Sequence, residues 1–356
     1  MVELGGKVVY QIYPKSFQDT DGDGFGDLRG VIEHLDYLAE LGVDYLWITP
    51  FFTSPQYDNG YDIADYRNID PRYGTMEDFD ELVREAAKRG MYLMMDMVLN
   101  HTSTKHEWFQ KALAGDEEYK DFYIFRKGKA PGVPPTNWES KFGGSAWEFE
   151  PRRGQYYLHI FSKKQPDLNW ANPDVFAEFA DLLLFLANNG VEVFRLDAIA
   201  FTWKVLGTDC QNEPPVHEIT QALRAALRIV APACALKAEA IVGPQDLIAY
   251  LGQGKHFGKV SDLAYHNSVM VQLWGALASR HTRLFEVALS NFPAKPASAT
   301  WGTYVRCHDD IGWAIGDDDA RGAYLEGHTH RAFLSEWRGK GRYVQAEVPG
   351  GATPDP

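Results

Sequence analysis

The sequence predicts an α/β fold, specifically a (β/α)8 barrel of the TIM type, incomplete at its eighth strand and with a subdomain inserted after strand 3. Three observations predict it. Short apolar or β-branched runs alternate with helix-length amphipathic stretches. The runs are continuous, as in strands that are buried on both faces of a parallel sheet. Polar side chains follow several runs, at the strand ends where barrels carry their chemistry.

Seven strand-like runs can be placed along the chain. The predicted strands are residues 7–13, 45–49, 92–98, 191–196, 235–240, 260–264 and 303–307. The predicted helices between them are residues 28–41, 76–88, 175–188, 217–230, 246–250 and 269–279. An open doubly wound sheet is the second choice, because no Gly-rich phosphate-binding turn follows the first run.

The alternation stops between residues 106 and 170, where Gly, Pro, Trp, Tyr and charged residues predominate. We interpret this segment as an inserted subdomain, with a short strand at 156–161. The predicted division is therefore a first barrel part at 1–105, the insertion at 106–170 and a second barrel part at 171–356. After residue 313, the only strand-like run is 342–348.

Composition excludes several classes of protein. The chain has 35 Lys and Arg against 49 Asp and Glu, a net charge of −14. Such a chain repels nucleic-acid phosphates and anionic lipid, so we expect neither partner. Three scattered cysteines form no disulfide or zinc pattern. No leader or membrane-length apolar run is visible, and a cytoplasmic location is expected. Aromatic residues make up 13% of the chain. Most of them are expected in the core, and an excess beyond that suits a pocket that stacks on sugar rings.

Charged side chains collect at four predicted strand ends, in the sequences DMVLNHT, FRLDA, KAEA and RCHDD. Alone, an Asp after a strand is usually a helix cap, and an Arg-x-Asp is usually a surface pair. Together they bring several carboxylates to one rim. Glycoside cleavage needs two carboxylates across the bond, one to attack carbon and one to protonate the leaving oxygen. Arg195 next to Asp197 would keep the nucleophile ionised, and crowding by Asp197 and Asp309 would keep Glu239 protonated.

These four motifs, in this order, resemble the signature regions of the α-amylase superfamily, glycoside hydrolase family 13. The resemblance extends to about residue 313. It implies that Asp197 is the nucleophile, Glu239 the general acid/base and Asp309 the stabiliser of the transition state. It further implies that the sugar at the cleavage point is bound by His101, Arg195 and His308.

Two subfamilies are resembled by different parts of the chain. Residues 8–170 look like oligo-1,6-glucosidase and trehalose-6-phosphate hydrolase, through VYQIYPKSFQDTDGDGFGDLRGV, DNGYDIADY, KFGGSAW and YYLHIFSKKQPDLNW. Residues 172–313 look more like amylosucrase, through GVEVFRLDAIAFTWKVLGT, KAEAIV and YVRCHDDIGW. In both groups the DNGYD motif shapes the pocket for a terminal glucose. The resemblance then implies that Asp58 bonds its hydroxyls, Tyr61 stacks on its ring and Phe161 walls the same subsite.

A loop with acids at alternate positions predicts a metal site. It holds Asp19, Asp21, Asp23 and Asp27, with a glycine turn between them. Hard oxygen ligands at this spacing suit Ca²⁺, although the closing Glu of an EF-hand is absent. In the resembled group this loop binds Ca²⁺ or Mg²⁺ through these side chains and the carbonyl of the residue at Phe25. We expect a structural role. The alternative is a solvated acidic turn.

The sequence therefore predicts a retaining α-glucoside-active enzyme. It would cleave small α-glucosides of the sucrose, maltose, isomaltose or trehalose type through a covalent glucosyl-Asp intermediate, by hydrolysis or transfer, without an organic cofactor. The end of the chain departs from the family, whose eighth strand, C-terminal β-sandwich domain and pocket-closing Arg find no match. The alternative is therefore a truncated, catalytically impaired member that only binds sugar. A non-enzymatic scaffold is a third choice, and the oligomeric state stays open.

Overall fold

The computed structural model describes residues 3–279 and 281–309, and the chain divides into two units, residues 1–239 and 240–356. The first unit contains a parallel sheet whose strands are neighbours in the order in which they occur in the chain. A doubly wound sheet reverses strand order at a switch point, and this sheet does not. The barrel is thus the correct fold class. The strands, in order, are β1 (Val9–Ile12), β2 (Tyr45–Ile48), β5 (Tyr92–Val98), β9 (Val191–Asp197) and β10 (Ala235–Ala238).

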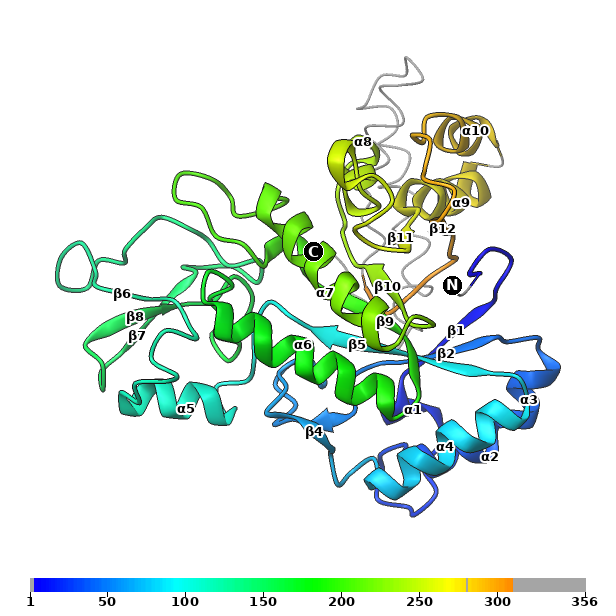
Figure 1. The fold of residues 1–356 in the computed structure, drawn as a ribbon, viewed down its shortest axis with the longest axis horizontal. Coiled ribbons are helices and arrows are strands. Elements are labelled where there is room, and N and C mark those ends of the chain that lie inside the picture. The colour runs from blue at the N-terminus through cyan, green and yellow to red at the C-terminus, as the bar shows by residue number, and fades with distance from the viewer. Residues whose placement is uncertain (1–2, 280, 310–356) are drawn as a thin grey trace. The chain divides into compact units, whose positions relative to one another are not determined.

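Helices connect these strands, as barrel topology requires (Figure 1). The best defined is α4, which the sequence places correctly. Its N-cap Thr75 accepts from the Asp78 backbone N–H, and the Asp78 carboxylate accepts from the Thr75 backbone N–H in return, a capping box. The helices of the first unit are α1 (Pro14–Phe17), α2 (Leu28–Glu33), α3 (Leu35–Glu40), α4 (Met76–Lys88), α5 (Glu107–Ala114), α6 (Pro173–Asn188), α7 (Pro214–Val230) and the 3₁₀ turn η1 (Ile199–Phe201).

The prediction of one helix at residues 28–41 is wrong, because the segment forms two short helices. The break lies at His34, whose backbone leaves the helical region at φ −104° and ψ 9°. Apolar spacing continues across the break, with Leu35 and Leu38 fully buried, so periodicity alone could not reveal it. A short antiparallel pair, β3 (Phe52–Thr53) and β4 (Asp65–Ile69), follows β2 and was not predicted.

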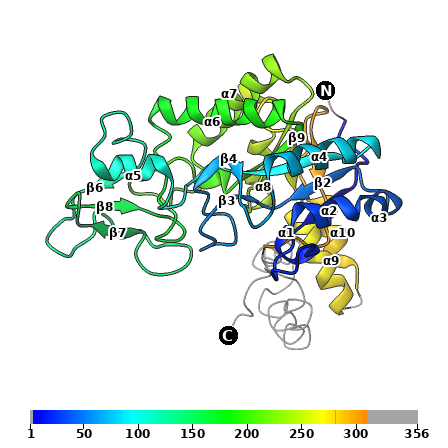
Figure 2. The same cartoon turned by 90° about the horizontal axis from the view of Figure 1, so that it is seen from below.

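The segment after β5 forms a small antiparallel sheet of its own. Its strands pair in the order β6 (Phe125–Arg126), β8 (Gln155–Leu158), β7 (Trp147–Glu150). Figures 1 and 2 show this sheet set apart from the parallel strands, with α5 beside it. It packs around its own apolar cluster, which includes Trp147 and Leu158. The predicted strand at 156–161 starts one residue earlier and ends at Leu158.

The second unit contains a parallel strand pair and helices. The predicted strand at 303–307 is wrong: the strand is β12, which ends at Gly302. Its register pairs Leu263 with Thr300, and the Thr300 N–H donates to the carbonyl of Asp262, which fixes the strand three residues earlier. The predicted strand at 342–348 lies outside the described residues. The elements of this unit are β11 (Leu263–Tyr265), β12 (Thr300–Gly302), α8 (Pro244–Leu247), α9 (Asn267–Ser279), α10 (Arg283–Ser290), η2 (Ile248–Tyr250) and η3 (Gly254–His256).

None of the helices in the described part of the chain combines the length and the apolar character that crossing a bilayer requires.

Candidate active site

The centre of the candidate site is a row of charged side chains on three neighbouring strands. Register places Asp96 of β5 and Lys237 of β10 on either side of Arg195 of β9. In-register residues of parallel strands point to the same face of the sheet. One step of two residues further along, Asp197 ends β9, and Glu239 follows β10 with its N–H bonded to the carbonyl of Leu196. The strand ends thus deliver carboxylates above a charged row.

Arg195 is the hub of that row. It is 1% exposed, and its Nη1 donates to Asp96 and, at 2.8 Å, to Oδ1 of Asp197. The guanidinium lies over the ring of Trp47 at 5.0 Å, and Trp47 Nε1 donates to Oδ2 of Asp96 at 2.7 Å. The ammonium of Lys237 lies 5.4 Å from the same ring. A guanidinium favours the ionised form of a bonded carboxyl group, so the row holds Asp197 as a carboxylate.

Glu239 is hydrogen-bonded to the backbone of the residue that follows Asp197. The residue after Asp197, Ala198, has a positive φ of 48°, in the left-handed region that side-chain-bearing residues seldom adopt. This turn aims the Ala198 N–H at Glu239, whose Oε2 accepts it at 2.7 Å. Strain of this kind persists where the surroundings enforce it, and it is common at active sites. The arrangement sets the two carboxyl groups of β9 and β10 on the same rim.

The structure also gathers the residues that were expected around a terminal sugar. Tyr61 lies with its hydroxyl 3.4 Å from Oδ2 of Asp96, and its carbonyl is 3.2 Å from Nε2 of His101. The rings of His101 and Phe161 are 5.4 Å apart. Burial lowers the pKa of His101 from 6.5 to about 3, so the imidazole is neutral. A neutral imidazole is suited to hydrogen-bonding a hydroxyl rather than to binding an anion.

The turn that carries Asp58 is fixed by a buried acid. Asp62, fully buried, accepts from the backbone N–H groups of Tyr57 at 2.9 Å and Asp58 at 3.0 Å. Gly60 has φ 102°, and a Cβ there would lie 2.6 Å from the carbonyl oxygen of Pro50. The DNGYD motif is thus a rigid turn as well as a source of site side chains.

Gln165 is a site residue that the sequence analysis missed. Fully buried, it donates from Nε2 to Oδ2 of Asp58 at 2.7 Å and lies 3.0 Å from Nε2 of His101. It therefore connects two residues that are 43 positions apart in the chain and fixes both. The signal in the sequence that could have identified Gln165 is its place in the KKQPDLNW segment.

Lys204 was also missed. Its ammonium pairs with Asp167 at 2.9 Å and donates to Oδ1 of Asn100 at 2.7 Å, and the side chain is 7% exposed. Burial raises the pKa of Asp167, and the Lys204 charge acts against that rise. Since Asn100 precedes His101, this pair ties the loop after β9 to the end of β5.

Two predicted site residues lie in the second unit. His308 Nε2 is 3.4 Å from Oδ1 of Asp309, and Cys307 Sγ is 3.7 Å from Oδ2 of the same residue. They follow β12 by six and seven residues, farther from the strand end than the sequence predicts. Their predicted roles beside Asp197 and Glu239 stay predictions.

The acidic loop after β1 brings oxygen ligands together. Carboxylate oxygens of Asp19, Asp21 and Asp27 lie within 4.8 Å of one another. Asp19 accepts from the N–H groups of Gly22 and Gly24, and these bonds lower its pKa. Three hard oxygens at this separation fit Ca²⁺ or Mg²⁺.

Two of the predicted metal ligands also make other hydrogen bonds. Asp27 also caps α2, accepting from Gly30 N at 2.7 Å. Asp23 is not part of the cluster of carboxylates. It instead accepts from the backbone N–H of Phe25 at 2.7 Å. The fit to a cation therefore rests on three of the predicted ligands.

Known proteins resemble this chain at family level. A family model described as alpha amylase, catalytic domain, matches residues 11–320. The trehalose-6-phosphate hydrolase of Escherichia coli is 59% identical over 192 residues, covering 54% of this chain and 35% of that protein. The oligo-1,6-glucosidase of Heyndrickxia coagulans is 54% identical over 200 residues, covering 56% of this chain and 36% of that protein. The chain therefore spans only about a third of the length of these curated relatives.

Solved structures agree. The trehalose-6-phosphate hydrolase of Bacillus licheniformis superposes with a TM-score of 0.69 at 44% identity, covering 74% of this chain and 49% of that one. A single-site mutant of the trehalulose synthase MutB, in complex with Tris, superposes with a TM-score of 0.70 at 41% identity, and the match covers 74% of this chain and 50% of that one. The relatives thus include hydrolases and a synthase. On its strand order, its carboxylates and this match over most of its length, the chain belongs to the α-amylase family, glycoside hydrolase family 13.

Proposed function

We propose that the chain is a retaining α-glucoside-active enzyme that cleaves small α-glucosides through a covalent glucosyl-Asp197 intermediate. The observation that carries this proposal is the pairing at the ends of β9 and β10. There, Arg195 bonds Asp197 while the N–H of Ala198 holds Glu239 on the same rim. Two carboxyl groups in unlike environments supply a nucleophile and an acid.

The proposed reaction has two steps. Asp197 attacks the anomeric carbon while Glu239 gives its proton to the glycosidic oxygen, so the C–O bond breaks and a glucosyl ester forms. The Glu239 carboxylate then takes a proton from water or from a sugar hydroxyl, and the freed oxygen attacks the same carbon and releases Asp197. Water gives hydrolysis and a sugar acceptor gives transfer. Asp309 is assigned the stabilisation of positive charge in both steps.

The neighbouring side chains suit a terminal sugar ring. Asp58, held by Gln165, offers carboxylate oxygens to its hydroxyls, and the neutral His101 offers a ring nitrogen. Tyr61 and Phe161 supply apolar ring faces. The proposal assigns Arg195 and His308 as further sugar ligands, and the substrates it expects are small α-glucosides such as sucrose, maltose, isomaltose or trehalose.

We also propose that residues 19–27 hold a structural Ca²⁺ or Mg²⁺. Asp19, Asp21 and Asp27 would supply its oxygens, and the ion would neutralise the mutual repulsion of these acids. The catalytic steps do not pass through it.

Turnover of a chromogenic aryl α-glucoside, with Ca²⁺ present, tests the assignment. Asp197→Asn should lose nearly all release with the fold kept, whereas the exposed Asp80→Asn should not. In Glu239→Gln, a substrate with a good leaving group should still form the ester, and azide should restore turnover and give an α-glucosyl azide. If the unaltered chain binds the glucoside but does not cleave it, the proposal of an enzyme is wrong and the chain is a sugar-binding member of the family. Full activity of Asp197→Asn would overturn the mechanism.

A further inference from the structure

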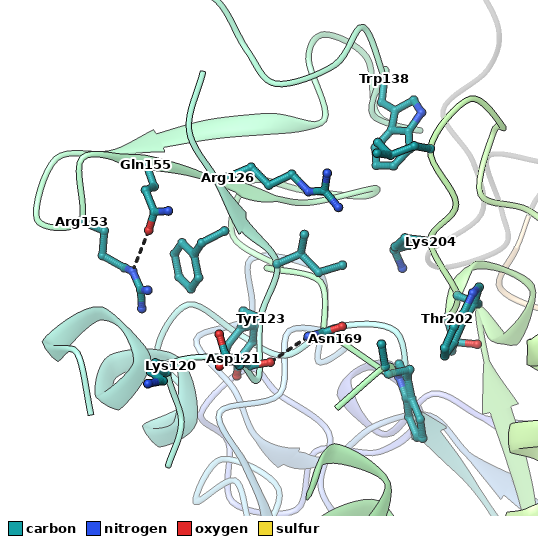
Figure 3. A pocket seen from close by; sticks show the side chains of 16 residues that line it. Lys120, Asp121, Tyr123, Arg126, Trp138, Arg153, Gln155, Asn169, Thr202 and Lys204 are labelled. Carbon is teal, nitrogen blue, oxygen red and sulfur yellow. Dashed lines mark hydrogen bonds between the residues drawn. The ribbon is translucent and has the colours of Figure 1, made fainter. Parts of the chain in front are cut away.

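A pocket of about 340 Å³ lies in the first unit (Figure 3). It is formed by the inserted segment and by the loop after β9. Among the described residues that line it, Lys204 also belongs to the candidate active site, where it bonds Asn100, but none is a proposed catalytic or sugar-binding residue. Its volume lies at the lower end of the range of small-molecule sites. The wall residues that matter here are Asp121, Phe125, Arg126, Trp138, Asn169 and Trp203.

The pocket is cationic although the chain is acidic. Its wall holds one acid, Asp121, in a chain whose net charge is −14. The two lysines of the wall are already paired: Lys204 with Asp167 at 2.9 Å, and Lys120 with Glu117 at 2.6 Å. The uncompensated charge therefore comes from arginines. The four basic residues of the wall are Lys120, Arg126, Arg153 and Lys204.

Arg126 is the group that points to a ligand. In the part of the chain that the structure describes, its guanidinium makes no hydrogen bond and no ion pair, and it extends into the pocket toward Trp138 and Lys204 (Figure 3). Arg153 is held differently. Its guanidinium lies 4.1 Å from the ring of Phe125 and donates to the carbonyl of Ala112, with no carboxylate partner among the described residues. A free guanidinium presents a planar fork that matches a phosphate or a carboxylate.

The aromatic residues of the wall indicate a second property of the ligand. Trp138 is fixed, because its Nε1 donates to the carbonyl of Thr208 at 2.9 Å and its ring stacks on Trp147 at 6.0 Å and 8°. Trp203 lies in the same wall, and Asn169 contributes an amide. Indole faces with amide and carboxylate groups nearby suit the apolar face and the hydroxyls of a sugar ring.

We infer that this pocket is a second binding site that takes a sugar bearing an anionic group, either a phosphate or a carboxylate. Arg126 binds the anion, and the indole rings of Trp138 and Trp203 pack against the ring. The wall contains none of the reacting carboxylates, so the inference does not depend on the proposed catalysis.

Titration calorimetry on the full chain tests this, with glucose 6-phosphate, glucuronate, methyl α-glucoside and inorganic phosphate as probes. At least one anionic sugar should bind about tenfold more tightly than methyl α-glucoside and than inorganic phosphate. Which of the two does so identifies the anionic group. Equal affinity for the neutral glucoside, equal affinity for phosphate alone, or no binding by any probe would overturn the inference.

Variants locate the binding. Arg126→Gln and Trp203→Ala should each weaken binding of the anionic sugar by about tenfold and leave turnover of the aryl glucoside unchanged. The exposed neighbour Lys127, which does not line the pocket, supplies the matched control Lys127→Gln, which should change neither. Asp58→Asn, in the candidate active site, should leave this affinity intact. If Asp58→Asn abolishes binding and Arg126→Gln does not, the ligand binds at the catalytic site and the second site is refuted.

Discussion

Replacing Asp96 by Asn tests the charged row beneath the carboxylates. The Asp96 side chain is fully buried and accepts from Arg195 and from Trp47 Nε1. Asn keeps the shape but removes the negative charge and one of the two acceptor oxygens. Breaking a buried ion pair on one side costs about 3–5 kcal/mol. Because Arg195 still bonds Asp197 at 2.8 Å, we expect the lower end, about 3 kcal/mol of unfolding free energy.

The measurement is urea unfolding followed by tryptophan fluorescence, with turnover measured on the same samples. The control is Asp80→Asn, the same substitution on an exposed face of α4, which should stay within about 0.5 kcal/mol of the unaltered chain. Turnover should fall at least tenfold in Asp96→Asn, because Arg195 loses one of the two carboxylates that orient it toward Asp197. A loss of stability below about 1 kcal/mol would refute the reasoning, because Arg195 would then not depend on Asp96.

Three further outcomes are expected. Gln165→Ala should lower kcat/KM by about 10- to 100-fold, since the buried amide that bonds the Asp58 carboxylate is lost; an unchanged value would contradict its positioning role. Burial lowers the pKa of His106 from 6.5 to about 4, so its stabilising effect is complete above pH 6.5 and is lost as the pH falls toward 4. Between pH 7 and pH 5, the free energy of unfolding should therefore fall by about 2 kcal/mol less in His106→Asn than in the unaltered chain. An equal fall in the two proteins would contradict this prediction. Removing Ca²⁺ by chelation should lower Tm, an effect that Asp19→Asn should abolish; identical Tm shifts in both proteins would exclude a cation at residues 19–27.

Local signals predicted most of the barrel elements. The limits of α4 and β5 agree with the sequence expectation because a capping box and a continuous apolar run mark them. The errors have tertiary causes. The helix at 28–41 breaks at His34 although its apolar spacing continues, and β12 takes its register from Leu263, 37 residues earlier in the chain. Neither cause is visible in a short sequence window.

The site shows the same division. Strand-end motifs predicted Arg195 and Asp197 as neighbours on one strand, because a spacing of two puts side chains on one face. Gln165 and Lys204 escaped because a lone Gln or Lys has no spacing pattern of its own. Their importance comes from partners on other segments, Asp58 for the one and Asp167 for the other. Such residues become visible only when a fold brings distant segments together.

In the proposed mechanism, the unlike surroundings of the two carboxyl groups explain why one rim supplies both a nucleophile and an acid. Asp197 accepts from a guanidinium that is buried and cannot lose its charge, which favours the ionised form. Glu239 accepts from a neutral backbone N–H, and in the proposal the nearby Asp197 carboxylate, a like charge, disfavours a second ionisation. The asymmetry follows from the arginine, because the guanidinium of Arg195 on β9 bonds Asp197, two residues further along the same strand. Exchanging the roles of the two acids would require moving that arginine to the neighbouring strand.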